Sequence, residues 1–304
     1  PWGCLAVWED ERIAMGGTVS PGGQVYVTDI FAARFDHDGQ PLDDAPIVVS
    51  RAPFSQTDPK VAWNGSVFLV IWESEDLTTF YKSRNVVAAR ISPQGQLLDT
   101  TPIVVDDEEY VDEHPWDVAS NGIDFFLIWQ DTSNNGSWSL DGARIDTNGN
   151  LTSLGMIYRP ANQYLAPWNA RLEWAGGRYL SVWSSWSGGL EGQLWDAAIN
   201  KIGSRFKIGN SQDTQPQIAS SGPGFYVSWG EGGTWGEVRG TPVSAGGSVA
   251  VFNGNLLTSG HYPIDPHPSP AWDGTTWSVL WETWSGTGDF ELYRTQADAA
   301  GAVI

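Results

Sequence analysis

Carboxylates that follow tryptophans are the first residues in this chain that could do chemistry. Glu9, Glu73 and Glu282 each come directly after a tryptophan. Two carboxyl groups about 5–9 Å apart can cleave a glycosidic bond, one as an acid and the other as a nucleophile or base. The chain has 36 acidic residues, however, so such pairs also arise by chance. We therefore predict these three glutamates as ligand-binding residues and assign no catalytic residue.

A second set of polar residues stands directly before prolines that open apolar runs. Asp58, His114 and His267 belong to this set. Imidazole and carboxylate groups bind polar ligands and divalent cations, so we predict a ligand-binding role for all three. Two isolated histidines are more often hydrogen-bonded to neighbouring loops than bound to a shared metal. No metal site is predicted from them.

An acidic run from Asp106 to Glu109, followed by Asp112 and Glu113, is the third candidate. Its oxygens are of the kind that Ca²⁺ prefers. A charge run is usually just solvated, and this is the default interpretation. The sequence therefore predicts no cofactor, with Ca²⁺ as the alternative.

Tryptophan is unusually frequent, with 18 residues in the chain. An indole ring can stack on the apolar face of a sugar, and its N–H can donate a hydrogen bond. Tryptophans outside the repeating core positions are therefore predicted to bind ligand, although they could instead pack between strands. They are Trp116, Trp138, Trp168, Trp186, Trp235 and Trp284.

The elements that must position these residues are short β-strands. Six apolar runs end in tryptophan, and a proline precedes five of them by about a dozen residues. Asn-Gly, Asp-Gly and other glycine turns separate the runs, as in tight hairpins. The six runs are residues 4–8, 68–72, 125–129, 179–183, 225–229 and 277–281.

A unit of four strands that returns about every fifty residues predicts an all-β fold, a β-propeller. Six four-stranded blades are expected, with seven as the alternative, in a single domain over residues 1–304. The long, varied loops should lie at one end of the blades, where binding sites are usual. The blades are predicted at residues 1–52, 53–110, 111–163, 164–211, 212–262 and 263–304.

The repeats resemble those of bacterial secreted β-propellers. The residues that carry the resemblance are Asn64-Gly65, Phe68–Trp72, Ala89-Arg90-Ile91 and Gly95–Asp99, with their counterparts along the chain. The resemblance covers essentially the whole sequence and implies the propeller fold. It implies no particular activity, because the repeated residues are structural.

Charge narrows the classes of partner. The formal net charge is −20, which repels nucleic acid, anionic membranes and polyanionic sugars. No apolar stretch of about 18 residues is present, so no membrane span is expected. The single Cys4 excludes a disulfide framework. The lysine-poor, acidic, tryptophan-rich composition favours a secreted, cell-surface or periplasmic protein.

These observations predict a non-catalytic binding protein that recognises a neutral carbohydrate or a protein surface through its tryptophan-rich loops. One alternative is a glycan-cleaving enzyme, a glycoside hydrolase or lyase, with acidic residues over the central channel. The other is a structural subunit of an extracellular assembly.

Overall fold

The structure is a computed structural model, and it describes residues 3–13, 26–76, 83–108, 112–132, 138–211, 214–231, 236–258, 267–284 and 290–304. These residues form 22 strands and one short 3₁₀ helix. Within these ranges, no helix is both long and apolar enough to cross a membrane. The chain divides into two compact units, Pro1–Arg159 and Pro160–Ile304, which are described separately.

The first unit contains three successive antiparallel repeats. In each repeat, apolar runs are separated by turns that contain glycine, and this pattern favours hairpins. A single parallel pairing of Arg84 with Asp112 joins the second and third repeats into one eight-stranded sheet. The strands are β1 (Cys4–Ile13), β2 (Tyr26–Phe35) and β3 (Ile47–Ser50); β4 (Gln56–Trp63), β5 (Phe68–Asp76), β6 (Ser83–Ile91) and β7 (Ile103–Asp106); and β8 (Asp112–Ser120), β9 (Phe125–Thr132), β10 (Trp138–Ile145) and β11 (Leu151–Tyr158).

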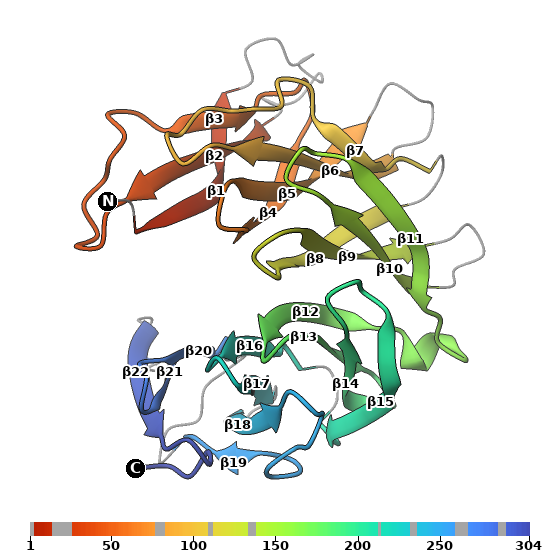
Figure 1. Ribbon diagram of the computed structural model, residues 1–304, viewed down its shortest axis with the longest axis vertical. Helices are drawn as coiled ribbons and strands as arrows, with labels where there is room; N and C mark the ends of the chain where they lie inside the picture. The colour runs from red at the N-terminus through yellow and green to blue at the C-terminus, as the bar shows by residue number, and fades with distance from the viewer. Residues whose placement is uncertain are drawn as a thin grey trace. The chain divides into compact units, whose positions relative to one another are not determined.

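The second unit repeats the pattern three more times. Its first sheet, β12 to β15, runs in chain order as one twisted layer (Figure 1). The elements are η1 (Gln163–Leu165), β12 (Trp168–Ala175), β13 (Arg178–Ser185), β14 (Gly189–Trp195) and β15 (Lys201–Gly209); β16 (Gln217–Ser220), β17 (Gly224–Glu231), β18 (Glu237–Ser244) and β19 (Asn255–Leu256); and β20 (Ser269–Trp272), β21 (Trp277–Trp284) and β22 (Phe290–Ala297). The six predicted repeats are thus present as antiparallel meanders.

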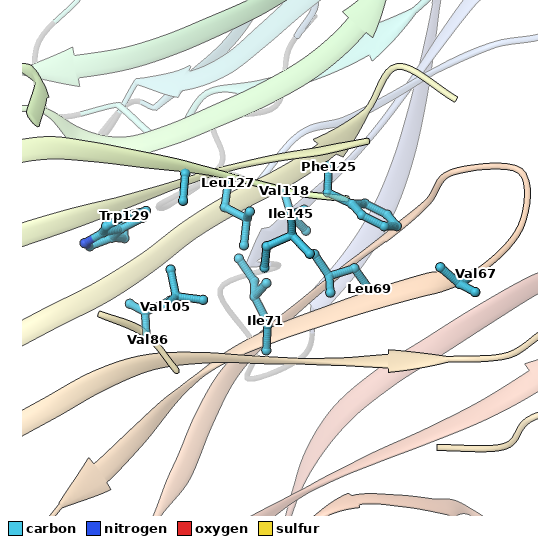
Figure 2. Packing of buried hydrophobic residues seen from close by; sticks show 12 residues of the cluster. Val67, Leu69, Ile71, Val86, Val105, Val118, Phe125, Leu127, Trp129 and Ile145 are labelled. Atoms are coloured by element: carbon cyan, nitrogen blue, oxygen red, sulfur yellow. The ribbon is translucent and has the colours of Figure 1, made fainter. Parts of the chain in front are cut away.

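Within each unit, hydrophobic cores lie between consecutive repeats. Figure 2 shows the core between the second and third repeats, where Ile71 and Val86 face Leu127 and Trp129. Trp129 occupies the repeated tryptophan position, and its counterparts Trp72, Trp183 and Trp229 are also fully buried. Burial of each such ring contributes about 2 kcal/mol or more to folding. The repeated tryptophans are therefore structural, as the sequence predicts.

Arg34 and Arg90, at corresponding positions of β2 and β6, link one repeat to the next. Arg90 pairs with Asp99 of its own repeat at 2.7 Å and donates a 2.8 Å hydrogen bond to the carbonyl oxygen of Thr147 in the following repeat. The same arrangement recurs with Arg34, Asp43 and Pro93. These arginines have structural partners and are not part of the candidate site.

Asn64 links the second and third repeats at the end of the tight turns. Its carbonyl oxygen accepts hydrogen bonds from the backbone N–H groups of Ser66 and Val67. Its amide nitrogen donates to the carbonyl oxygen of Ile123 at 2.8 Å and to Oγ1 of Thr147 at 2.9 Å. The side chain is only 1% exposed. The Asn-Gly turn therefore does more than reverse the chain.

Candidate functional site

Three predicted site residues converge at one end of neighbouring strands in the first unit. Glu73 lies on β5, Asp58 on β4 and His114 on β8. Nδ1 of His114 is 2.9 Å from Oε2 of Glu73 and 3.8 Å from Oδ2 of Asp58. One ligand atom from each of the three residues lies within 4.8 Å of the other two. We call these three side chains the Asp–Glu–His triad.

A β-bulge in β4 places Asp58 in this triad. Thr57 pairs with Glu73 and Lys60 pairs with Ile71, so two residues of β4 stand opposite one residue of β5. Such bulges redirect side chains next to functional sites. Asp58 has a φ of 53°, in the left-handed region that costs a non-glycine residue roughly 1–2 kcal/mol. The surrounding structure thus holds Asp58 in a strained conformation of the kind found at binding and active sites.

Glu73 is the fixed member of the triad. It is buried, and its Oε1 accepts a 3.1 Å hydrogen bond from Oγ1 of Thr57. Nε of Arg84 lies 3.6 Å from the same oxygen. Asp58 differs, because about half of its side chain is exposed. The triad therefore combines one anchored carboxylate with one that faces solvent.

His114 is held by an aromatic neighbour. Its ring packs edge-on against Trp116, with 4.7 Å between the ring centroids. Trp116 itself is buried, and its indole N–H has no hydrogen-bond acceptor among the described residues. A buried donor without a partner costs free energy. An oxygen atom of a bound ligand or of a water molecule would satisfy it.

Acidic groups outnumber basic groups around the triad. Oε2 of Glu9 accepts a 3.3 Å hydrogen bond from the backbone N–H of Asp58, which brings a third carboxylate to the site. Among the described residues, the basic side chains there are Arg84 and Lys60, and Nζ of Lys60 donates to the carbonyl oxygen of Asp58. A neutral or cationic ligand suits this surface better than an anionic one.

A second acidic group lies next to the triad, between the second and third repeats. Glu113 is completely buried, and burial together with the nearby Asp106 carboxylate raises its pKa to about 9. Burial also raises the pKa of Asp131 to about 6, with the carboxylate of Asp141 adding to the effect. The prediction of a solvated charge run is wrong at Glu113, because its side chain is completely buried.

The second unit brings together two other predicted residues. Nδ1 of His267 lies 3.4 Å from Oε1 of Glu282, and both side chains are about half exposed. Trp186 is 62% exposed, in the turn between β13 and β14. The backbone of the next residue, Ser187, donates a 2.9 Å hydrogen bond to the carbonyl oxygen of Tyr164. The short turn between β13 and β14 thus contacts η1, which precedes this sheet.

The remaining predicted tryptophans are Trp138, Trp168, Trp235 and Trp284. Trp138 and Trp168 are half-buried, at the first positions of β10 and β12. Trp284 ends β21, but its side chain lies outside what the structure describes, as does the whole of Trp235.

Sequence reasoning missed Thr57 and Arg84, which hold Glu73. No motif marks either residue. The available signal was the strand register, because Thr57 stands opposite Glu73 once the hairpin is drawn.

Comparison with known proteins identifies the fold. No protein-family model matches the sequence, and no curated protein sequence is similar to it. A Trypanosoma rangeli sialidase structure matches with a TM-score of 0.55 and 10% identity, over 89% of this chain and 50% of the sialidase chain. A GH43_1 enzyme from Xanthomonas citri (TM-score 0.48, 14% identity, 86% and 93% coverage) and an endo-arabinanase from Bacillus licheniformis (0.47, 13%, 81% and 95%) also match.

The sialidase match, with its TM-score above 0.5, confirms the predicted all-β propeller fold, while the number of blades and the single domain stay predictions. The prediction of a non-catalytic binding protein is contradicted, because the matching sialidase is an enzyme. At identities of 10–14% the likeness itself establishes the fold alone. The glycan-cleaving alternative is therefore compared with the geometry of the triad.

Proposed function

We propose that this protein is a glycoside hydrolase whose catalytic carboxylates are Glu73 and Asp58. The observation that carries the proposal is the convergence of Asp58, Glu73 and His114 within 4.8 Å. Retaining glycosidases place their two carboxyl groups about 5–5.5 Å apart, whereas inverting enzymes leave about 6.5–9.5 Å for a water molecule. The spacing of the triad is nearer the retaining geometry. The propeller fold shared with a sialidase supports the same class of reaction by analogy.

The environments of the two carboxyl groups assign their roles. Glu73 is anchored by Thr57, His114 and Arg84, which suits a nucleophile that must attack the anomeric carbon from a fixed position. Asp58 faces solvent and can exchange its proton with water, so it is the acid and base. His114 lies beside both groups and positions them.

Cleavage then follows two steps. Asp58 gives its proton to the glycosidic oxygen as the bond from that oxygen to the anomeric carbon breaks, and a Glu73 oxygen forms a covalent bond to that carbon. Asp58 next takes a proton from a water molecule, whose oxygen displaces Glu73. The sugar leaves with its anomeric configuration retained, and both carboxyl groups return to their starting states.

The substrate class in this proposal is a neutral glycan. The net charge of −20 and the three carboxylates at the site disfavour sialosides and polyuronates. Because such substrates are extracellular polymers, the proposal includes a secreted, cell-surface or periplasmic location.

The test is a hydrolysis assay on neutral polysaccharides and nitrophenyl glycosides, with sialosides and polyuronates as anionic comparisons. We expect release of reducing sugar from at least one neutral substrate, with the anomeric configuration retained by NMR. Glu73→Gln and Asp58→Asn should each lower kcat by about 10²-fold or more. His37→Gln and Asp38→Asn, on an exposed turn, are matched controls that keep full activity. Activity that survives in Glu73→Gln would assign the chemistry elsewhere.

A further inference from the structure

We propose that the Asp–Glu–His triad is also a binding site for a divalent transition-metal cation of the Zn²⁺ or Mn²⁺ type, and that the bound cation inhibits the enzyme. The binding part stands on the geometry of the three side chains alone. The inhibition part rests on the proposed function, because it concerns the same carboxylates.

Three ligand atoms of the right chemistry already face one point. They are Nδ1 of His114, Oε2 of Glu73 and Oδ2 of Asp58, with separations of 2.9 Å and 3.8 Å from the nitrogen to the two oxygens. Ligands on a tetrahedral cation with bonds of about 2.1 Å stand about 3.4 Å apart. A cation would therefore replace the contact between His114 and Glu73 and need only small movements of the side chains.

Two of the three ligand side chains are held in place, and the third is exposed. Glu73 is buried and tied to Thr57, and His114 is packed against Trp116, so two of the three lose little freedom on binding. Asp58 is the exposed member, and its side chain can close over the cation from the solvent side. Glu9 approaches the backbone of Asp58 and adds negative charge nearby.

The imidazole decides the class of metal. Calcium and magnesium take oxygen ligands, whereas imidazole suits zinc and the other transition metals. Two carboxylates and one imidazole give three protein ligands, which leaves a position for water. We therefore expect Zn²⁺ and Mn²⁺ to bind more tightly than Ca²⁺ or Mg²⁺.

Cation binding and glycoside cleavage compete for the same lone pairs. A Glu73 oxygen bound to a metal cannot attack the anomeric carbon, and a metal-bound Asp58 cannot carry the proton to the glycosidic oxygen. The cation would thus block both steps at once. Hydrolytic activity would therefore fall as the free concentration of the metal rises.

Calorimetric titration of the untagged chain with Zn²⁺, Mn²⁺ and Ca²⁺, without substrate, tests the binding part. We expect one tight site for Zn²⁺, binding weaker by about tenfold or more for Ca²⁺, and a rise in Tm with Zn²⁺. Glu73→Gln and His114→Gln should each weaken Zn²⁺ binding by about tenfold or more. His37→Gln is the matched control for adventitious histidine binding. Asp58→Asn, on an exposed side chain, replaces Glu73→Gln if that variant does not fold.

Equal Zn²⁺ affinity in the unchanged chain and in the folded triad variants would overturn the site, and equal affinity for Ca²⁺ and Zn²⁺ would overturn the metal class. If Zn²⁺ binds but no glycan is cleaved, the proposed function fails while the metal site stands. If glycans are cleaved and Zn²⁺ does not bind, the metal site fails alone. In an active chain, half-inhibition at the Kd for Zn²⁺ supports the competition, and full activity with the site saturated refutes it.

Discussion

Glu113 and His114 are neighbours in the sequence and have opposite environments. Side chains alternate in direction along β8. His114 therefore points toward Glu73, whereas Glu113 is buried between the second and third repeats. There Glu113 accepts hydrogen bonds from the backbone N–H groups of Val86 and Glu108, and burial raises its pKa. The residue therefore stays protonated in the folded chain at pH values where the unfolded chain has released its proton.

This difference makes stability depend on pH. The contribution of Glu113 is complete below its ordinary pKa of 4.5 and is lost as pH rises toward the folded-state pKa of about 9, because the unfolded chain binds fewer protons over that range. The slope from this group is at most about 1.4 kcal/mol per pH unit. Denaturant unfolding should show that the free energy of unfolding falls as pH rises from 5 to 8.5, and that this fall is smaller in Glu113→Gln. The same slope in both proteins would contradict the assignment.

At the scale of single residues, the sequence predicts each member of the triad as a site residue, but it does not predict that the three side chains lie close together. Asp58 and His114 each precede a proline, and Glu73 follows a tryptophan. Whether they touch depends on the β-bulge between Thr57 and Lys60 and on the packing of β4 beside β8. No local pattern encodes either feature, so the candidate site could be predicted only as scattered parts.

At the scale of the element, the hairpins followed directly from sequence. Short apolar runs bounded by Asn-Gly and similar turns became strands, because no other local structure satisfies both signals. The links between repeats were harder to foresee. The acid that pairs with Arg90 is Asp99 of the same repeat, and a backbone carbonyl oxygen makes the link to the next repeat.

Asn64 gives an element-scale prediction. Asn64→Ala removes two hydrogen bonds within the turn and two to the following repeat, and it leaves buried groups unpaired. We expect a loss of about 2–4 kcal/mol in the free energy of unfolding. Asp273→Ala is the comparison, because Asp273 accepts the same turn hydrogen bonds on an exposed surface. Asp273→Ala should lower the free energy of unfolding by clearly less than Asn64→Ala does, and equal losses would show that the links to the next repeat contribute little.

At the scale of the whole molecule, charge is the dominant property. With a net charge of −20, the chain attracts cations over about 10 Å at 0.1 M salt, and added salt screens the attraction. We expect the Kd for Zn²⁺ to rise several-fold when NaCl increases from about 0.02 M to 0.5 M, while the hydrolysis of a neutral glycan changes little. Calorimetry and activity measured in the same buffers would check this. A salt-independent Kd would mean that only the immediate ligands matter.

The buried amide of Asn64 also bears on how the protein is produced. Three acceptor sequences for N-linked glycosylation are present, at Asn64-Gly65-Ser66, Asn135-Gly136-Ser137 and Asn150-Leu151-Thr152, and the second lies outside the described residues. Both hydrogens of the Asn64 amide are engaged by the next repeat, whereas Asn150 is exposed on a turn. In a eukaryotic secretory host, the folded chain would accept an oligosaccharide at Asn150 and not at Asn64. An oligosaccharide added to Asn64 during synthesis would prevent the second and third repeats from joining.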